Sequence, residues 1–290
     1  MSLRFRCWII RLALCGLPWL VGCSALQLGY NQGPTMAYWW LDAYADFSSE
    51  QRPRVKSAIE AWLAWQRATQ MPLYARELAT LQTLAPKDIS AAQACALIVP
   101  WQRHAERAFD QAVPALADLV PELGAEQLAH IEQHYAEKNA ELLHSHLQTG
   151  TAERHKATLD RTVKRAESLY GRLEDAQRRL LGEALRASPF DAERWFAERR
   201  QRQNDILRRL RQWQRERSDR PMVQAGLRQL AGEMLESPRA DYRAYSARVN
   251  DAYCQMAAQL HNSSTPAQRQ KLADRLRTWE VDLRALAALR

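Results

Sequence analysis

The stretch TAERHKATLDRTVKRAESLYGRLEDAQRRLLGEALRA, residues 151–187, indicates the fold class of this chain. It contains no proline, and its apolar residues recur mostly at steps of three or four, at Leu159, Val163, Ala166, Tyr170, Leu173 and Leu180. This spacing predicts one apolar seam along an α-helix. We expect a single long helix here, ended by Ser188-Pro189.

A second helix is expected to follow from Phe190-Asp191 to about Arg217. Two long helices joined by a short turn favour an antiparallel hairpin on which shorter helices pack. Ala, Leu, Arg, Gln and Glu dominate the composition, only 10 of the 290 residues are glycine, and no alternating strand pattern is evident. The sequence therefore predicts an all-α fold: an elongated multi-helix bundle with a long antiparallel helical hairpin in the middle.

The shorter helices are predicted from helical periodicity and from prolines, which cut or kink the first half of the chain. Their expected ranges are 48–69, 73–84, 88–112, 125–148, 222–236, 239–261 and 265–289. Three of the helix starts carry a hydroxyl three residues before a glutamine, which is a capping box: Ser48 to Gln51, Ser90 to Gln93 and Thr265 to Gln268. Gln127 and Gln177 occupy similar positions without the hydroxyl.

The amino terminus combines basic residues, a short apolar run and the sequence Leu20-Val21-Gly22-Cys23. The run is too short for a membrane span, as in a signal peptide. The sequence resembles the processing box of bacterial lipoproteins, which implies cleavage before Cys23 and acylation of its sulfur; a plain secretory signal with an incidental cysteine is the alternative. By analogy with enterobacterial sorting, Ser24 implies the bacterial outer membrane.

We therefore expect a lipoprotein signal peptide over 1–22, a lipidated tether over 23–35, and a single all-α periplasmic domain over 36–290. The mature chain would retain Cys95 and Cys254 besides Cys23. Two thiols in an oxidising compartment favour a disulfide between them, and two buried free thiols are the alternative.

The charge balance is basic, with 41 Lys+Arg against 33 Asp+Glu. Part of this basic excess lies in the predicted signal peptide and would be removed with it. In a cell envelope, a modest arginine excess suits lipid headgroups, lipopolysaccharide or acidic proteins, and we expect no nucleic-acid partner. The densest cluster lies between 194 and 220, and its candidate anion-binding or partner-binding residues are Arg199, Arg200, Arg202, Arg208, Arg209 and Arg211. An ordinary salt-bridged helix face is the alternative, because acidic residues are interspersed.

The most aromatic stretch is residues 36–47, which includes Tyr38, Trp39, Trp40 and Tyr44. These side chains cannot all share one stripe of a helix. Core packing is the interpretation we favour, and contact with a membrane interface is the alternative.

The chain as a whole resembles an uncharacterised family of proteobacterial helical lipoproteins, a domain of unknown function. The resemblance lies in Cys23-Ser24-Ala25-Leu26 running into Gly29-Tyr30-Asn31, in Tyr38-Trp39-Trp40-Leu41-Asp42, and in the Arg- and Gln-rich helix around Trp195 and Trp213. It implies a location and a fold class, and no activity.

A weaker resemblance is to the Spy/CpxP-type periplasmic chaperones, whose helices begin with a Leu-Thr-x-x-Gln motif. Residues 89–93 and 264–268 come closest, followed by 47–51, and none carries Leu before Thr. A capping box alone explains a hydroxyl three residues before a glutamine.

Two sets of side chains are candidates for chemistry. His130 and His134, four residues apart on a predicted helix, could share a metal ion, which suggests a metal-assisted envelope enzyme as an alternative function. The pattern lacks the glutamate of His-Glu-x-x-His, so a solvated helix surface is the default. Asp42 and Asp46 could pair for acid–base work, although capping or ion pairing is the simpler interpretation.

No other catalytic pattern and no cofactor motif is evident. The expected function is therefore a non-enzymatic binding, scaffolding or chaperone-like role, moored to the membrane through the N-terminal lipid.

Overall fold

The computed structural model describes residues 21–146 and 150–288, with backbone alone for residues 21–31, 145, 146 and 151. The predicted all-α class is confirmed, since this described part contains helices and no strand. In chain order its elements are α2 (Val21–Ala45), α3 (Gln51–Trp65), the π-helical turn η1 (Gln66–Gln70), α4 (Met71–Leu84), α5 (Ala91–Ala96), α6 (Val99–Leu119), the 3-10 turn η2 (Val120–Glu122), α7 (Ala125–His146), α8 (Thr151–Tyr170), α9 (Asp175–Ala187), α10 (Ala192–Glu216), α11 (Arg220–Leu235), α12 (Ala240–Asn262) and α13 (Pro266–Ala288).

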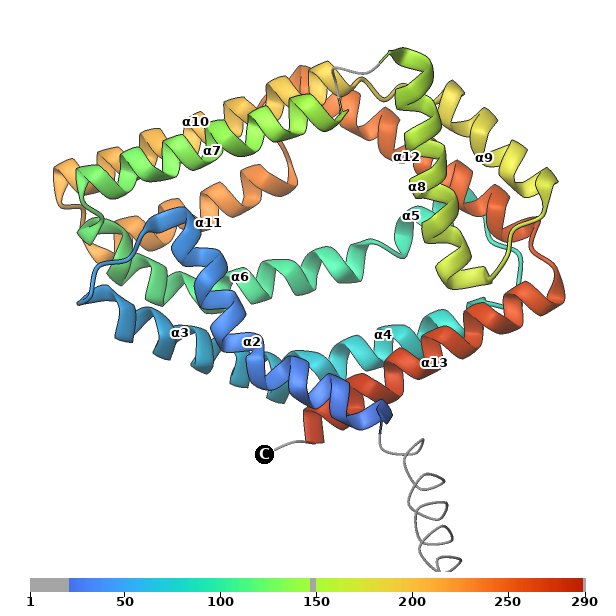
Figure 1. Cartoon of the computed structure of the whole chain (residues 1–290), viewed down its shortest axis with the longest axis horizontal. Helices are drawn as coiled ribbons and strands as arrows, with labels where there is room; N and C mark the ends of the chain where they lie inside the picture. The colour runs from blue at the N-terminus through green and yellow to red at the C-terminus, as the bar shows by residue number, and fades with distance from the viewer. Residues whose placement is uncertain (1–20, 147–149, 289–290) are drawn as a thin grey trace, which may run out of the picture.

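The helices form an elongated body in which antiparallel pairs run along the long axis (Figure 1). Helix α4 packs against α13 along one edge, α6 packs against α11 in the middle, and α7 packs against α10 along the opposite edge. Helices α8, α9 and α12 gather at one end (Figure 1). The predicted antiparallel packing is thus present, although α10 lies alongside α7 and not in one hairpin with residues 151–187.

Two large apolar clusters hold these pairs together. One joins α6, α7, α10 and α11, and includes Val113, Leu207 and Val223. The other joins α4, α8, α9, α12 and α13. Leu173 and Leu181 are 2% and 1% exposed there, so this cluster is fully desolvated at its centre. Burial of these side chains contributes about 25 cal/mol for each Å² of apolar surface removed from water.

The expectation of one helix over 151–187 is wrong, because the chain breaks between α8 and α9. Gly171 adopts φ 78°, a left-handed conformation that glycine tolerates and that ends α8. Glu174 then caps α9: its side chain accepts from the backbone of Gln177, whose side chain accepts from the backbone of Glu174. A carboxylate therefore supplies the cap that a hydroxyl supplies elsewhere.

Residues 24–35, most of the predicted lipidated tether over 23–35, are helical. They lie within α2, which runs from Val21 to Ala45 through Pro34. Helix α2 packs against α3, and a Cβ placed at Gly33 would lie 3.8 Å from the Leu63 side chain of α3, an ordinary van der Waals distance. Packing of this kind offsets the low helix propensity of glycine and proline.

Several prolines lie at helix starts as expected, but not every proline interrupts a helix. Pro72 begins α4 directly after the π-helical turn, so the predicted 48–69 and 73–84 helices are nearly continuous. Pro114 lies inside α6, which was expected to end at residue 112. Val113 and Ala117 on either side of it are 0% and 2% exposed, and this buried contact stabilises the helix through the proline.

Four of the five glutamines that mark helix starts meet in reciprocal pairs. Gln177 and Gln268 each donate an amide hydrogen to the other, at 2.8 and 2.9 Å, and each also accepts from the backbone at the start of its own helix. Gln51 and Gln127 exchange hydrogen bonds of 3.3 and 2.8 Å in the same way. Each pair therefore joins the starts of two helices far apart in the sequence.

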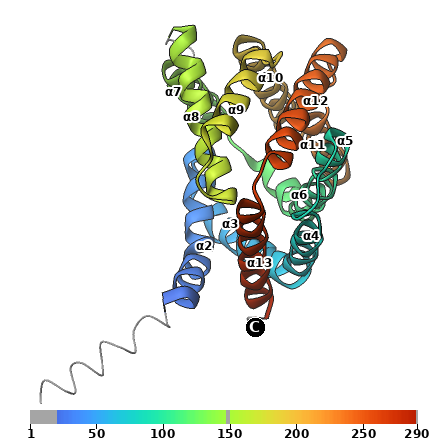
Figure 2. The ribbon, with the colours of Figure 1, turned by 90° about the vertical axis from the view of Figure 1, so that its right-hand side faces the viewer.

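The N-terminal end of α2 and the C-terminal end of α13 lie at the same edge of the molecule in both views (Figure 1, Figure 2). Among the described helices, none has the length and apolar character that crossing a bilayer requires. The predicted signal peptide falls almost wholly on residues 1–20, which lie outside the described residues.

Candidate functional site

The candidate site is an apolar pocket of about 610 Å³ between α4 and α13. This volume falls within the roughly 300–1,000 Å³ of typical small-molecule pockets. The lining consists mainly of leucines and two tryptophans: Leu78, Leu81, Leu84, Ala85, Ile89, Leu97, Trp101, Leu169, Tyr170, His261, Leu272, Leu276, Trp279, Asp282, Leu283 and Leu286. A pocket with this lining removes the apolar surface of a ligand from water and offers it few hydrogen bonds.

The pocket exists because two leucine-rich helices face each other. Leu78, Leu81 and Ala85 recur at steps of three or four along α4 and its C-cap, and Leu272, Leu276, Trp279 and Leu283 do so on α13. The two helices are antiparallel neighbours. Their apolar stripes therefore face a shared space, whose remaining walls come from α6, α8, α12 and the segment around α5.

Trp101 of α6 is held in the wall by other rings. Its ring centroid lies 5.7 Å from that of Tyr74 and 6.1 Å from that of His104, and Tyr74 and His104 meet edge to face at 4.9 Å. The Nε2 atom of buried His104 lies 3.6 Å from a carboxylate oxygen of Glu77. This aromatic contact fixes the position of one large side chain at the pocket.

The two polar side chains Tyr170 and His261 are bonded within the protein. The Tyr170 hydroxyl lies 2.9 Å from Nδ1 of His261, and Nε2 of His261 lies 2.8 Å from the carbonyl oxygen of Lys87. Because a carbonyl can only accept, Nε2 carries the hydrogen, and Nδ1 accepts from the tyrosine hydroxyl. Both side chains are therefore already hydrogen-bonded within the protein.

Burial keeps both groups neutral near pH 7. It raises the pKa of Tyr170 to about 12. It also lowers the pKa of His261, outweighing the hydrogen bond to Lys87, which acts in the opposite direction. Asp282, which is half-buried, is the acidic residue among the described lining residues. Apart from Asp282, the pocket wall is thus uncharged, and it can accommodate a long uncharged apolar group.

The structure gives most of the predicted anion-binding arginines partners within the chain. Arg199 donates to Asn139 at 3.0 Å, Arg209 pairs with Glu233 at 2.8 Å, and Arg211 pairs with Glu132 at 2.5 Å. Arg208 pairs with Asp205. These contacts favour the alternative interpretation of a salt-bridged helix face.

Arg202 belongs to a buried ion cluster around Glu198, whose side chain is 4% exposed. Glu198 accepts hydrogen bonds from Arg202 at 2.8 Å, from Ser237 at 2.7 Å and from both ends of the Arg239 guanidinium at 2.6 and 2.8 Å. Burial alone would raise the pKa of Glu198, but these donors together lower it to about 2. Arg200 is exposed, and no ion pair of it is found among the described residues.

His130 and His134 lie against α2 and are half-buried, where a solvated surface was expected. Nε2 of His130 lies 3.1 Å from the carbonyl oxygen of Ala43, and the His134 ring lies 4.1 Å from that of Tyr44. The described residues contain no cluster of three or more His, Cys, Asp or Glu side chains arranged to hold a metal ion. The contacts with α2 explain why both histidines occupy this face.

The Asp42–Asp46 pair has a structural role at the end of α2. An oxygen of Asp42 accepts the backbone N–H of Phe47 at 3.0 Å, and Asp46 adopts φ 45° where the helix ends. Arg52 donates to the Tyr38 hydroxyl at 2.9 Å in the same region. Capping, the simpler of the two interpretations, describes Asp42.

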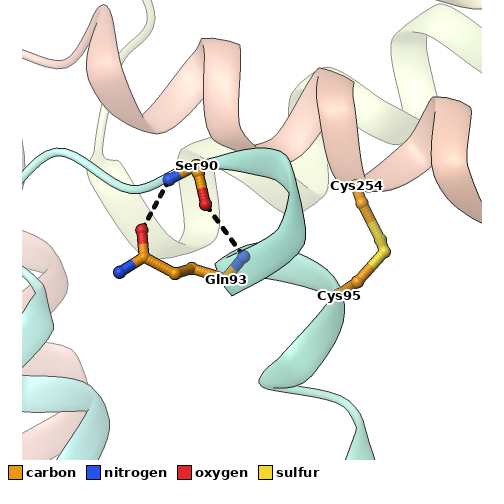
Figure 3. Close-up of a disulfide and its surroundings, with 4 residues drawn as sticks. All are labelled: Ser90, Gln93, Cys95 and Cys254. Atoms are coloured by element: carbon orange, nitrogen blue, oxygen red, sulfur yellow. Dashed lines mark hydrogen bonds between the residues drawn. A yellow bond between two sulfur atoms is a disulfide. The ribbon is translucent and has the colours of Figure 1, made fainter.

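Cys95 of α5 and Cys254 of α12 form a disulfide, with their Cα atoms 5.3 Å apart (Figure 3). The capping box of Ser90 and Gln93 begins α5 directly beside it (Figure 3). The bond holds this short helix, and the adjacent Ile89 of the pocket wall, against α12. The side chain of Cys23 lies outside the described residues.

Sequence reasoning missed the pocket. The stripe of Leu272, Leu276, Trp279 and Leu283 is visible in the sequence, but it predicts burial without showing that a space remains beside it. Which helix lies opposite α13 depends on contacts across some 190 residues of chain, and no local pattern encodes them.

A family model described as a family of unknown function, DUF6279, matches residues 43–243, more than half of the chain. A search of curated proteins and a search of solved structures find no match. The matched range includes the pocket walls from α4, α5, α6 and α8, while His261 and α13 lie beyond it.

Proposed function

The chain belongs to the DUF6279 family of unknown function, and we propose that it is a lipid-anchored envelope protein that binds the hydrocarbon chain of an amphiphile without catalysing a reaction. The observation that carries this proposal is the α4–α13 pocket of about 610 Å³. Anchoring at Cys23 in the outer membrane is the location that we propose for it, supported by the sequence around that residue.

A hydrocarbon chain suits the pocket better than a segment of polypeptide does. A peptide entering the pocket would bring backbone amides that need hydrogen-bond partners, and an unpaired buried amide costs about 1–3 kcal/mol by mutational data. Tyr170 and His261 are already bonded to each other and to Lys87. A methylene chain makes no such demand, and each buried CH₂ contributes about 0.8 kcal/mol.

Binding is tested with the neutral fluorescent probe N-phenyl-1-naphthylamine, chosen because Asp282 would repel an anionic probe. We expect a saturable rise in fluorescence that dodecyl maltoside reverses by competition. Leu283→Trp should abolish most of the saturable signal, because the larger ring occupies the pocket.

The matched control is Leu180→Trp. Leu180 is also a half-buried leucine packed against the same apolar cluster, but it does not line the pocket. Its variant should bind the probe as the unmodified protein does. Absence of saturable binding by the unmodified protein, or an equal loss in both variants, would rule out the proposed ligand class.

The anchor is tested separately by intact mass spectrometry of the protein from bacterial membranes. We expect a mature chain beginning at Cys23 with added diacylglycerol and acyl mass. Cys23→Ser should prevent acylation and leave the leader uncleaved, because serine offers no thiol for the thioether. A mature chain with an unmodified cysteine would overturn the anchor and leave the pocket result standing.

A further inference from the structure

Helix α2 has an exposed apolar face that its own packing does not use. Met36, Trp39 and Trp40 are 62%, 65% and 63% exposed. Positions i, i+3 and i+4 lie on one side of a helix, so the three side chains form one continuous face. We call this group the α2 tryptophan face.

The opposite side of the same helix is buried. Tyr38 is 4% exposed and packs with Phe47, Val55 and Ile59, with Leu41 beside them. The expectation that the aromatic stretch packs in the core therefore holds for Tyr38 and Phe47 and fails for the two tryptophans. Because α2 already has its core contact on the other side, none of the described residues covers the α2 tryptophan face.

The near absence of charged residues along α2 is compatible with contact between this helix and lipid. Of its 25 residues only Asp42 is charged, and that carboxylate accepts the Phe47 N–H at the far end. The 21 residues of α2 before Asp42 carry no charge, and yet the helix is not apolar enough to cross a membrane. Tryptophan is enriched at membrane–water interfaces, so two exposed tryptophans on one face of a helix that cannot span favour a position in the bilayer interface. Unlike most interfacial helices, α2 has no Lys/Arg-rich polar face, so its contact with lipid would depend on its apolar side chains.

The position of α2 along the chain supports the same occupant. Cys23 and Met36 are in one continuous helix, thirteen residues apart, which corresponds to roughly 20 Å at about 1.5 Å per residue. A chain moored at Cys23 therefore holds the α2 tryptophan face close to the bilayer surface. This step rests on the proposed anchor.

We propose that the α2 tryptophan face lies in the headgroup region of the membrane that holds the lipid anchor, so that Trp39 and Trp40 form a second attachment and fix the orientation of the domain. Indole rings favour this depth because one edge is apolar and the N–H remains hydrated.

The test uses the full acylated protein in phosphatidylethanolamine–phosphatidylglycerol vesicles that contain a lipid brominated near the headgroup end of its acyl chain. Bromine quenches nearby tryptophans. We expect the tryptophan fluorescence of the acylated protein without substitutions to be quenched. The acylated Trp39→Phe/Trp40→Phe variant should lose most of this quenching. Phenylalanine keeps both exposed sites apolar and does not disturb the core.

Trp65→Phe/Trp195→Phe is the matched control, because it removes two half-buried tryptophans, from α3 and α10, that do not line the pocket. It should leave the bromine-dependent quenching intact. Equal quenching in the unmodified protein and in the Trp39/Trp40 variant would overturn the inference, as would a dimer in solution that the same variant dissociates. The intact mass of the same sample shows whether the protein is acylated, so a failure of the proposed anchor is detected separately. If the protein is not acylated, the two double variants can be compared in the same way after unacylated protein is mixed with the vesicles.

Discussion

At the scale of single residues, the paired glutamines show how much a short motif can and cannot predict. The spacing Thr265 to Gln268 correctly indicates a capped helix start. It does not show that the Gln268 amide also reaches Gln177 and the carbonyl of Arg172. A side-chain amide has two donors and an acceptor, and the cap uses only the acceptor. The remaining donors become contacts between helices that are distant in the sequence.

The Spy/CpxP resemblance rests on these same motifs. Capping and glutamine pairing give Gln51 and Gln268 a structural role in this fold. The motifs therefore need no client protein to explain them, and a chaperone-like role has to be argued from other surfaces.

Glu198 links the stability of the fold to pH. Its pKa is about 2 in the folded chain, against an ordinary value of 4.5. The folded state therefore binds fewer protons than the unfolded state between these values. The stabilising contribution is complete above pH 4.5 and is lost as the pH falls through about 2.

We predict that Glu198→Gln lowers the free energy of unfolding at pH 7 by about 3 kcal/mol, because Arg202 and Arg239 lose their buried counter-charge. The variant should also show a weaker loss of stability on acidification below pH 4.5. Urea unfolding at several pH values measures both effects. Glu106→Gln, at an exposed glutamate, should change neither. A variant with the unmodified pH profile would show that the cluster does not set it.

At the scale of helices, periodicity located most elements, and the errors have specific causes. The break at Gly171 depends on a left-handed backbone conformation and on a glutamate acting as a cap, whereas the apolar spacing of residues 151–187 continues across it. Pro114 does not end α6 near residue 112, and Pro34 lies within α2, because tertiary packing retains the helix around each. Local propensity is a weak guide where a helix is held by its neighbours.

The Cys95–Cys254 bond should stabilise the contact between α5 and α12. It closes a loop across 159 residues, and disulfides typically contribute about 2–5 kcal/mol. We predict that a reductant lowers the urea midpoint of the unmodified protein. Cys95→Ala/Cys254→Ala should show the lower midpoint from the start and no further response to reductant. A reductant effect on that double variant would mean that the drop has another cause.

At the scale of the whole molecule, the sequence was sufficient for the all-α class and insufficient for the site. Helical class follows from composition and spacing, which are local. The pocket requires α4 and α13 to lie side by side, and the α2 tryptophan face requires knowledge of which side of α2 is covered. Both are properties of the assembled fold, and both concern apolar residues that a sequence assigns to the core by default.

The proposed pocket and the α2 tryptophan face together describe a protein that meets lipid in two ways. One contact would orient the domain at a bilayer, and the other would hold a single chain away from water. Arg199, Arg209 and Arg211, the residues that first suggested headgroup binding, are bonded within the chain. The lipid contacts proposed here are accordingly apolar in character.

The disulfide also imposes an order on biogenesis. If the chain is exported as proposed, Cys95 is synthesised well before Cys254 and reaches the oxidising compartment first, so its thiol is unpaired for part of export. Within the proposed mature chain, Cys23 is the sulfur that could pair with it wrongly in that interval, since Cys7 and Cys15 belong to the predicted leader. Conversion of the Cys23 thiol to a thioether would prevent it from forming a disulfide. Acylation would therefore favour the correct Cys95–Cys254 pairing in addition to anchoring the protein.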